Sequence, residues 1–378
     1  MASLAPRSPR PSDALSDPAT GTAAPSAAPR RRPGRRPAPG AVREEPRRVG
    51  LSEIAARAGV SEATVSRVVN RRQGVARRTR DAVEKAAAEL GYARPVRGRL
   101  VAVVTEHVTN PFFAELAERI EAALAPHGLR TLVCPAFAGG VQERDYVEAM
   151  ADKGVVAVVF LSASNTLAGA PARMYERLRL REIPYVGVNG VFADGVAVPV
   201  YSTDDLLAAE LAVDHLYRLG HRSIGMVSGP EGNTPADRRV RGFLDAMARR
   251  GLSDAGRLVV RQSFGVEGGQ AAAQTLYSRR ATAIVAASDF MALGAIRGLR
   301  RLGCSVPGDV SVIGYDGSAI TEFVEPPLTT VRQPADRLAL EVTRSVLALV
   351  ARREVPVGEL LFDPELVVRS TTGPAPRR

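Results

Sequence analysis

Residues 51–70 read Leu-Ser-Glu-Ile-Ala-Ala-Arg-Ala-Gly-Val-Ser-Glu-Ala-Thr-Val-Ser-Arg-Val-Val-Asn. The first eight residues have the pattern of a short helix, and Gly59 followed by Val60 interrupts it. Ser61 has the side chain of a helix N-cap, so a second helix is expected to begin there and to run to Asn70. Two short helices joined through a glycine turn form a helix-turn-helix.

A third helix is predicted at about residues 77–90, because apolar residues recur there at helical spacing. The three helices then turn one apolar face inward and form a small core. The residues expected in this core are Ile54, Val60, Val65, Val68, Val83, Ala87 and Leu90. The exposed side of the second helix is expected to present Glu62, Ala63, Ser66 and Arg67.

The net charge of +11 is concentrated near the N-terminus. Residues 1–46 carry 8 arginines against 4 acidic residues, and residues 47–99 carry 13 basic against 5 acidic residues. Residues 100–378 carry 30 basic and 31 acidic residues, so this larger part is almost neutral. A basic helical module attached to a neutral body is typical of a protein that contacts nucleic acid.

Residues 1–46 are predicted to be a disordered tail. They hold 10 of the 27 prolines and few large aliphatic residues, so they cannot bury enough surface to offset the entropy of ordering. The arginine-rich cluster at residues 30–37 has two interpretations. It either contacts DNA phosphates or is an ordinary solvated basic tail.

From about residue 100 the pattern changes to short apolar runs that alternate with helical stretches. This alternation predicts parallel sheets covered by helices, and a length of about 270 residues favours two doubly wound lobes over one. Ligands of such folds lie at the carboxyl ends of the strands, so a cleft between the lobes is the expected binding site. The predicted strands are 100–104, 130–134, 155–161, 184–188, 223–227, 257–262, 283–287 and 310–315.

Several motifs follow the helix-turn-helix in a fixed order. They are Thr79-Arg80, Leu90-Gly-Tyr92, Asn110-Pro-Phe-Phe113, Leu219-Gly-His-Arg-Ser-Ile-Gly225, Arg239-x2-Gly-Phe243, Ser288-Asp-Phe-Met-Ala-Leu-Gly294, Val312-Ile-Gly-Tyr-Asp316 and Pro327-Leu-Thr-Thr-Val-Arg-Gln333. In this order and spacing they resemble the LacI/GalR family of bacterial transcriptional repressors, from Val49 to Arg369. The resemblance implies an N-terminal all-α helix-turn-helix headpiece joined to a two-lobed, periplasmic-binding-protein-like (type I) α/β core of two doubly wound parallel sheets.

The resemblance also divides the chain into domains. The expected parts are the tail at 1–46, a DNA-binding domain at 47–92, a basic linker at 93–99, an effector-binding and dimerisation core at 100–369 and a second tail at 370–378. Within the core, we expect the N-lobe at about 100–190 and 334–352 and the C-lobe at about 191–330 and 355–369.

Family membership implies a homodimer on near-palindromic double-stranded operator DNA. Arg67 can donate two hydrogen bonds to guanine, which would discriminate by about 1–3 kcal/mol, and a phosphate contact is its alternative role. No leucine heptads follow Arg369 that could join dimers into tetramers. The residues expected at the DNA are Glu62, Ala63, Thr64, Ser66, Arg67 and Asn70.

The resemblance further implies a small-molecule effector between the lobes. Its expected ligands are Asn110, Phe112, Asn189, Arg239, Phe264, Asp289 and Asp316. Carboxylate, guanidinium, amide and aromatic groups together suit a mono- or oligosaccharide, although a flat heterocycle between Phe112 and Phe264 would also fit. Asp289 has a second interpretation as a helix cap, and Phe113 is expected in the core.

One segment departs from the family. Only seven residues, Ala93–Arg99, separate Tyr92 from the first predicted strand, and Pro95 and Gly98 leave no room for the family's short hinge helix. No leucine is available there to wedge into the minor groove. We expect the linker arginines to lie against the DNA backbone or minor groove instead, and the effector to change the spacing of the two headpieces. These arginines are Arg94, Arg97 and Arg99.

Other classes of protein are disfavoured. The chain has no P-loop, no Gly-x-Ser-x-Gly and no His-Glu-x-x-His, and its four histidines form no pair at metal-ligand spacing, so no enzyme, cofactor or metal is predicted. No apolar run spans a bilayer and no signal segment opens the sequence, so a cytoplasmic protein is expected. A transport-type sugar-binding protein shares the two-lobed fold and stays as an alternative, as does an activator or dual regulator.

Overall fold

The computed structural model describes residues 49–69, 74–90, 92, 99–136, 140–167, 169, 173–192 and 196–377. The chain divides into two compact units, one within residues 1–95 and one within residues 96–378.

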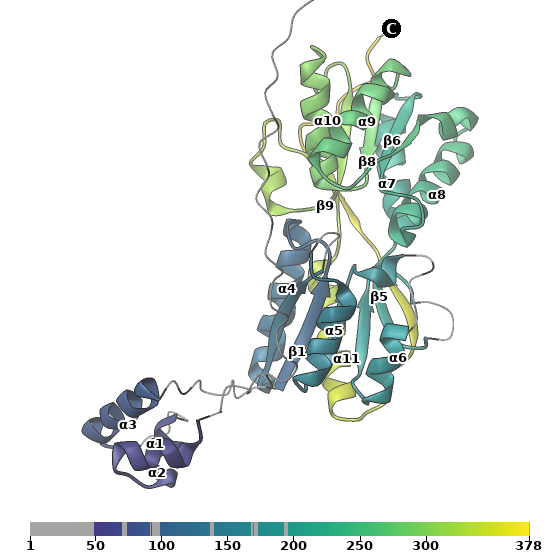
Figure 1. Cartoon of the computed structure of the whole chain (residues 1–378). Coiled ribbons are helices and arrows are strands. Elements are labelled where there is room, and N and C mark those ends of the chain that lie inside the picture. The colour runs from purple at the N-terminus through teal and green to yellow at the C-terminus, as the bar shows by residue number, and fades with distance from the viewer. Residues whose placement is uncertain are drawn as a thin grey trace, which may run out of the picture. The chain divides into compact units, whose positions relative to one another are not determined.

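The first unit is the three-helix headpiece (Figure 1). Gly59 adopts a left-handed backbone with φ of 64° and ends the first helix, as its position in the sequence predicts. The Ser61 hydroxyl accepts a hydrogen bond from the Thr64 amide at 3.2 Å, which caps the second helix. The helices are α1 (Leu51–Ala58), α2 (Glu62–Val69) and α3 (Arg77–Glu89).

The apolar face of the headpiece is buried where the sequence pattern predicts it. Ile54, Val65, Val68 and Val83 are each at most 3% exposed and pack together. The predicted core residues Val60, Ala87 and Leu90 are half-buried against this cluster.

The second unit contains two six-stranded sheets, one in each lobe. The N-lobe sheet has the order β11-β5-β4-β3-β1-β2 and is parallel throughout. Helices α4 and α11 cover one face, and α5 and α6 cover the other (Figure 1). The N-lobe elements are β1 (Arg99–Thr105), α4 (Pro111–Leu124), η1 (Ala125–His127), β2 (Leu129–Pro135), α5 (Glu143–Asp152), β3 (Ala157–Leu161), η2 (Ser164–Thr166), α6 (Arg173–Leu180), β4 (Tyr185–Val188), β5 (Pro199–Thr203), α11 (Ala335–Val350) and β11 (Gly358–Phe362).

The C-lobe repeats this plan with the order β12-β10-β9-β8-β6-β7, in which only the β10–β12 pairing is antiparallel. Helices α9 and α10 cover one face, and α7 and α8 cover the other. No helix in the described ranges is both long enough and apolar enough to cross a bilayer. The C-lobe elements are α7 (Asp205–Arg218), β6 (Ile224–Ser228), α8 (Thr234–Arg249), η3 (Ser253–Leu258), β7 (Val259–Arg261), α9 (Val266–Ser278), β8 (Ala283–Ala286), α10 (Asp289–Arg301), β9 (Ser311–Asp316), η4 (Ala319–Glu322), β10 (Thr329–Arg332) and β12 (Glu365–Val367).

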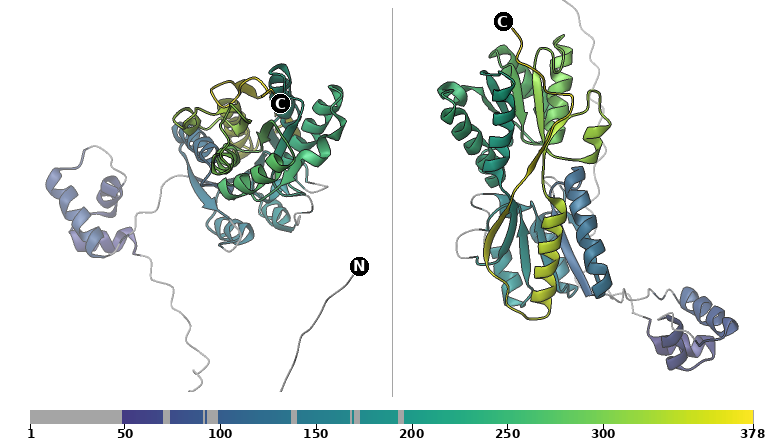
Figure 2. Two further views of the ribbon diagram at one scale, coloured as in Figure 1. Left: turned by 90° about the horizontal axis from the view of Figure 1, so that it is seen from above. Right: turned by 180° about the vertical axis from the view of Figure 1, so that it is seen from behind.

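The chain passes between the lobes three times: from β5 to α7, from β10 to α11, and from β11 to β12 (Figure 2). Two predicted lobe boundaries are therefore wrong. β5 pairs with β4 and β11 pairs with β5, so residues 199–203 and 358–362 belong to the N-lobe and not to the C-lobe. Both strands complete a sheet through partners that are remote in sequence or separated from them by a loop, which a local apolar pattern does not reveal.

The predicted C-terminal tail is also wrong, because residues 370–375 are part of the C-lobe. Thr371 is fully buried, and its hydroxyl donates to the Val312 carbonyl at 2.6 Å. The Gly373 carbonyl lies 3.1 Å from Nε2 of the buried His221, and the Ala375 amide donates to the Leu219 carbonyl. His221 thus has a structural role.

Deleting residues 370–378 is expected to destabilise the protein. Each lost hydrogen bond contributes about 0.5–1.5 kcal/mol and leaves a buried partner unpaired, so the melting temperature should fall by about 5 °C or more. Differential scanning calorimetry measures this change. Deleting only residues 376–378 keeps the Ala375 contact and is the matched control. Equal melting temperatures for both deletions and the full chain would contradict the structural role of this segment.

Candidate functional site

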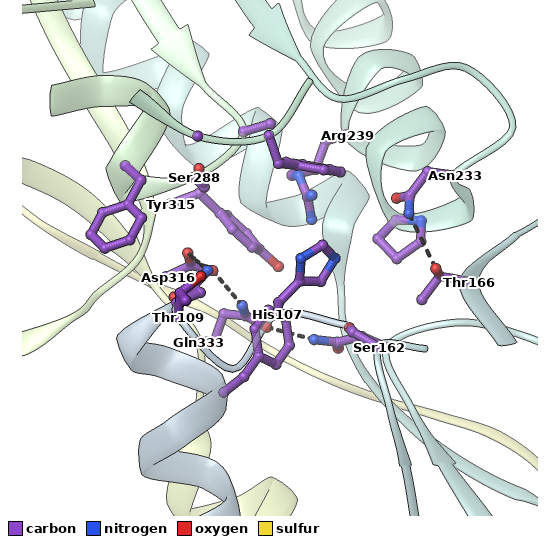
Figure 3. Close-up of a pocket in the computed structure, with 18 residues that line it drawn as sticks. His107, Thr109, Ser162, Thr166, Asn233, Arg239, Ser288, Tyr315, Asp316 and Gln333 are labelled. Carbon is purple, nitrogen blue, oxygen red and sulfur yellow. Dashed lines mark hydrogen bonds between the residues drawn. The ribbon is translucent and has the colours of Figure 1, made fainter. Parts of the chain in front are cut away.

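A cavity of about 120 Å³ lies between the lobes at the carboxyl ends of strands from both sheets (Figure 3). The N-lobe wall consists of His107, Thr109, Asn110, Phe113, Ser162, Thr166 and Asn189. The C-lobe wall consists of Asn233, Pro235, Arg239, Phe264, Gly265, Ala287, Ser288, Phe290, Tyr315 and Asp316, and Gln333 lies on a crossover between the lobes.

Arg239 on α8 points into this cavity from a buried position. Its guanidinium is paired with the Asp205 carboxylate, and its Cζ atom lies 4.2 Å from the centroid of the Tyr315 ring. The Tyr315 hydroxyl donates to the same carboxylate at 3.0 Å. The Nε atom of Arg239 is buried without a hydrogen-bond partner.

Asp316 at the end of β9 has a left-handed backbone with φ of 122°, which a non-glycine residue rarely adopts. Its carboxylate accepts hydrogen bonds from Asn110 at 2.9 Å and from Gln333 at 2.8 Å. Burial raises the pKa of Asp316 to about 6, although these hydrogen bonds oppose the shift. Burial also raises the pKa of the neighbouring Asp289 to about 7, and the charge of Asp316 adds to that effect.

Contacts between the lobes close the cavity. The Asn110–Asp316 hydrogen bond joins the N-lobe to the C-lobe, and Asn233 donates to the Thr166 hydroxyl at 3.1 Å. Arg238 and Glu359 form a two-pronged ion pair at 2.6 and 2.7 Å between α8 and β11. The lobes are therefore held together by polar contacts on several sides of the site.

Aromatic rings from both lobes meet at the cavity. The His107 ring is stacked on Phe113 with centroids 5.6 Å apart and meets Phe264 edge-on at 5.7 Å. Burial lowers the pKa of His107, so its ring is neutral at pH 7. This corner offers flat apolar surface together with the imidazole nitrogens.

Five of the seven predicted effector residues line the cavity: Asn110, Asn189, Arg239, Phe264 and Asp316. The other two, Phe112 and Asp289, do not belong to its lining. Phe112 is 2% exposed in the N-lobe core. Phe113 is 8% exposed and belongs to this core as expected, but it also lines the cavity, because adjacent residues of a helix point in directions about 100° apart.

Asp289 begins α10 behind the cavity wall. Its carboxylate accepts hydrogen bonds from the Ser318 amide at 2.8 Å and from the Thr330 hydroxyl. The predicted heterocycle site between Phe112 and Phe264 is not formed, because Phe112 lies in the core. Two further lining residues, His107 and Gln333, were not predicted. His107 lies two residues after the end of β1. Gln333 directly follows β10, a strand that the sequence did not predict.

The residues predicted to contact DNA belong to α2 or directly follow it in the sequence. Glu62, Ala63 and Arg67 are exposed, and Thr64 and Ser66 are half-buried. Asn70, the tail at 1–46 and the linker residues 93–98 lie outside the described residues, whereas Arg99 is exposed at the start of β1.

Comparison with known proteins matches both units of the chain. The family described as "Bacterial regulatory proteins, lacI family" matches residues 50–95, and a "Periplasmic binding protein-like domain" matches residues 213–372. The HTH-type transcriptional regulator MalR of Streptomyces coelicolor is 43% identical over 335 residues, which cover 86% of this chain and 97% of that protein.

Two solved structures are similar to most of the chain. The transcriptional regulator CelR–cellobiose complex is 31% identical with a TM-score of 0.66, and it covers 86% of this chain and 100% of its own. The lac repressor dimer bound to operator and the anti-inducer ONPF is 26% identical with a TM-score of 0.66 and the same coverage.

The raised pKa of Asp316 predicts how stability changes with pH. A carboxyl whose pKa is higher in the folded chain contributes stability at low pH and loses it as the pH rises through that value. Between pH 5 and pH 8 this group alone should cost on the order of 1 kcal/mol. Asp316→Asn removes the titrating group, so its melting temperature should fall less over this range than that of the wild type.

The exposed Asp254 provides the control, because Asp254→Asn should keep the wild-type pH profile. Thermal melts at half-unit pH steps measure all three proteins. Parallel profiles for the wild type and Asp316→Asn would show that Asp316 titrates in its ordinary range.

Proposed function

Since this chain belongs to the LacI family of bacterial regulatory proteins and is a DNA-binding transcriptional regulator, not an enzyme, we propose that it is a sugar-controlled repressor that binds its operator as a homodimer. The observation that carries the proposal is the closed cavity, to which both lobes contribute hydrogen-bonding side chains. A ligand that contacts both walls changes the free energy of lobe closure, which is the basis of control by an effector.

The headpiece reads DNA through the exposed side of α2 in this proposal. Arg67 is exposed there and has the donor geometry for a guanine edge, while the Ala63 methyl suits a thymine methyl group. Glu62 lies on the same side and can accept from cytosine. Thr64, Ser66 and Asn70 are assigned to phosphate contacts that position the helix.

The linker of seven residues replaces the family's hinge helix in this proposal. Its arginines, Arg94, Arg97 and Arg99, lie along the DNA backbone or minor groove without a leucine wedge. Control by the effector then acts on the distance between the two headpieces, because half-site spacing is fixed by the dimer geometry.

The homodimer is supported by exposed apolar side chains on both lobes. Phe323 is 84% exposed beside Ile320 on the C-lobe, and Leu132 and Val133 are each 39% exposed on the edge strand β2 of the N-lobe. Apolar patches of this kind mark interfaces, and a two-fold dimer suits a near-palindromic site. The lac repressor structure is likewise a dimer on operator DNA.

A mono- or oligosaccharide is the proposed effector. Arg239 offers guanidinium donors and Asp316 offers acceptors. The side chains of Asn189 and Gln333 add amide groups, and together they match the donors and acceptors of sugar hydroxyls. The rings of His107 and Phe264 suit the apolar face of a sugar. The similar CelR structure contains cellobiose. We place the regulator in the cytoplasm, where its DNA target lies.

Selection of binding sites from random duplexes at a stated salt concentration tests the DNA part. The wild type should select a near-palindromic consensus, and adding the effector should change its occupancy. Arg67→Ala should lose the preference at one guanine per half-site, a discrimination of about 1–3 kcal/mol. Arg57→Ala on α1, whose guanidinium pairs with Glu89, is the control and should keep the consensus. A weaker salt dependence with an unchanged consensus would reassign Arg67 to a phosphate contact.

Phe323→Glu tests the dimer. A carboxylate in the centre of an apolar interface is costly to desolvate, so sedimentation should show a monomer and operator affinity should fall at least tenfold. Leu180→Glu is the matched control, because Leu180 is 78% exposed at the end of α6 and belongs to neither patch. An unchanged dimer in Phe323→Glu would exclude this C-lobe patch from the interface.

A further inference from the structure

The wall of the cavity carries very little charge. Among the described lining residues, Arg239 and Asp316 are the charged side chains, and His107 is neutral because burial lowers its pKa. The remaining lining side chains are amides, hydroxyls, aromatic rings or small apolar groups.

Neither of these two charged side chains favours the binding of an anion. The positive charge of Arg239 is already neutralised by its ion pair with Asp205. The charge of Asp316 disfavours ionisation of the neighbouring Asp289 and raises the pKa of that carboxyl. Asp316 in the C-lobe wall, together with Asp205 and Asp289 behind it, gives three carboxyl groups against the one guanidinium of Arg239.

Two neighbouring arginines, Arg238 and Arg261, are also engaged in ion pairs. Arg238 pairs with Glu359 at 2.6 Å and Arg261 pairs with Asp237 at 2.6 Å. An anionic ligand could take a guanidinium from these pairs only by breaking one of them, and it would lie beside the buried carboxylates. Burying an unpaired charge next to like charges is strongly unfavourable.

From this charge distribution we propose that the effector is an uncharged polyol, and that phosphorylated or carboxylated counterparts of the same sugar are excluded. The inference rests on the proposed function of the cavity as the effector site. A neutral sugar suits this wall, since Asp316 accepts from its hydroxyls and the guanidinium of Arg239 donates to them. Discrimination against anions then arises from the protein's own charges and needs no steric barrier.

Matched pairs of ligands test this inference on the full-length protein. Isothermal titration calorimetry at pH 7.5 compares glucose with glucose 1-phosphate and glucose 6-phosphate, ribose with ribose 5-phosphate, and cellobiose and maltose with their 6′-phosphates. The two glucose esters place the phosphate at opposite ends of the ring. For every sugar that binds, the neutral form should bind at least tenfold more tightly than its phosphate ester.

A gain-of-function variant tests the electrostatic cause. Thr109 is exposed at the N-lobe wall, so Thr109→Arg adds a cation to the cavity and Thr109→Gln adds similar bulk without charge. Relative to Thr109→Gln, the arginine variant should bind the phosphate ester at least tenfold more tightly and the neutral sugar within twofold. Retained operator binding shows that both variants fold.

The outcomes separate this inference from the proposed function. If a phosphate ester binds the wild type as tightly as its neutral sugar, or if Thr109→Arg gains nothing for the ester, the inference is overturned while the cavity keeps its effector role. If no sugar and no ester binds, the effector role fails and takes the inference with it, whereas sequence-specific operator binding stands by itself.

Discussion

The buried carboxylate of Asp316 is the junction on which the arrangement of the two-lobed unit depends. It belongs to the end of β9 in the C-lobe, yet it accepts hydrogen bonds from Asn110 at the start of the N-lobe helix α4 and from Gln333 on a crossover. Asn110 uses its side-chain oxygen at the same time to cap α4 through the Phe112 amide. One polar group thus joins the two lobes at the wall of the cavity between them.

This junction extends deeper into the N-lobe. The Gln333 side-chain oxygen accepts hydrogen bonds from Asn189 at 3.1 Å and from the Thr203 hydroxyl at 2.8 Å. Asn189 and Thr203 follow β4 and end β5, so a connected polar chain runs from the C-lobe sheet across the crossover to the N-lobe sheet. A ligand that forms a hydrogen bond with Asp316 either replaces or adds to the hydrogen bonds of this network. In both cases it changes the strength of the contact between the lobes.

The site could be predicted in outline from particular residues. Arg239, Asp316 and Asn110 occur in motifs that resemble the LacI family, and the family relationship is confirmed by the matches to both units. The prediction of Phe112 as a ligand residue failed because its side chain lies in the core, whereas Phe113, one helical position on, belongs to the core as expected and also lines the cavity. His107 and Gln333 were not predicted, because their contacts at the site are with residues from other parts of the chain.

The sequence by itself determined the features that depend on near neighbours. The headpiece helices, the buried face formed by Ile54 and Val65, and eight of the strands follow from local periodicity, capping and glycine turns, which act over a few residues. Only the tertiary structure decided which lobe β5 and β11 complete, that residues 370–375 pack against His221, and that Asp205 neutralises Arg239. These outcomes are set by pairing between segments far apart in the chain, where burial and hydrogen bonding to distant partners outweigh the local pattern.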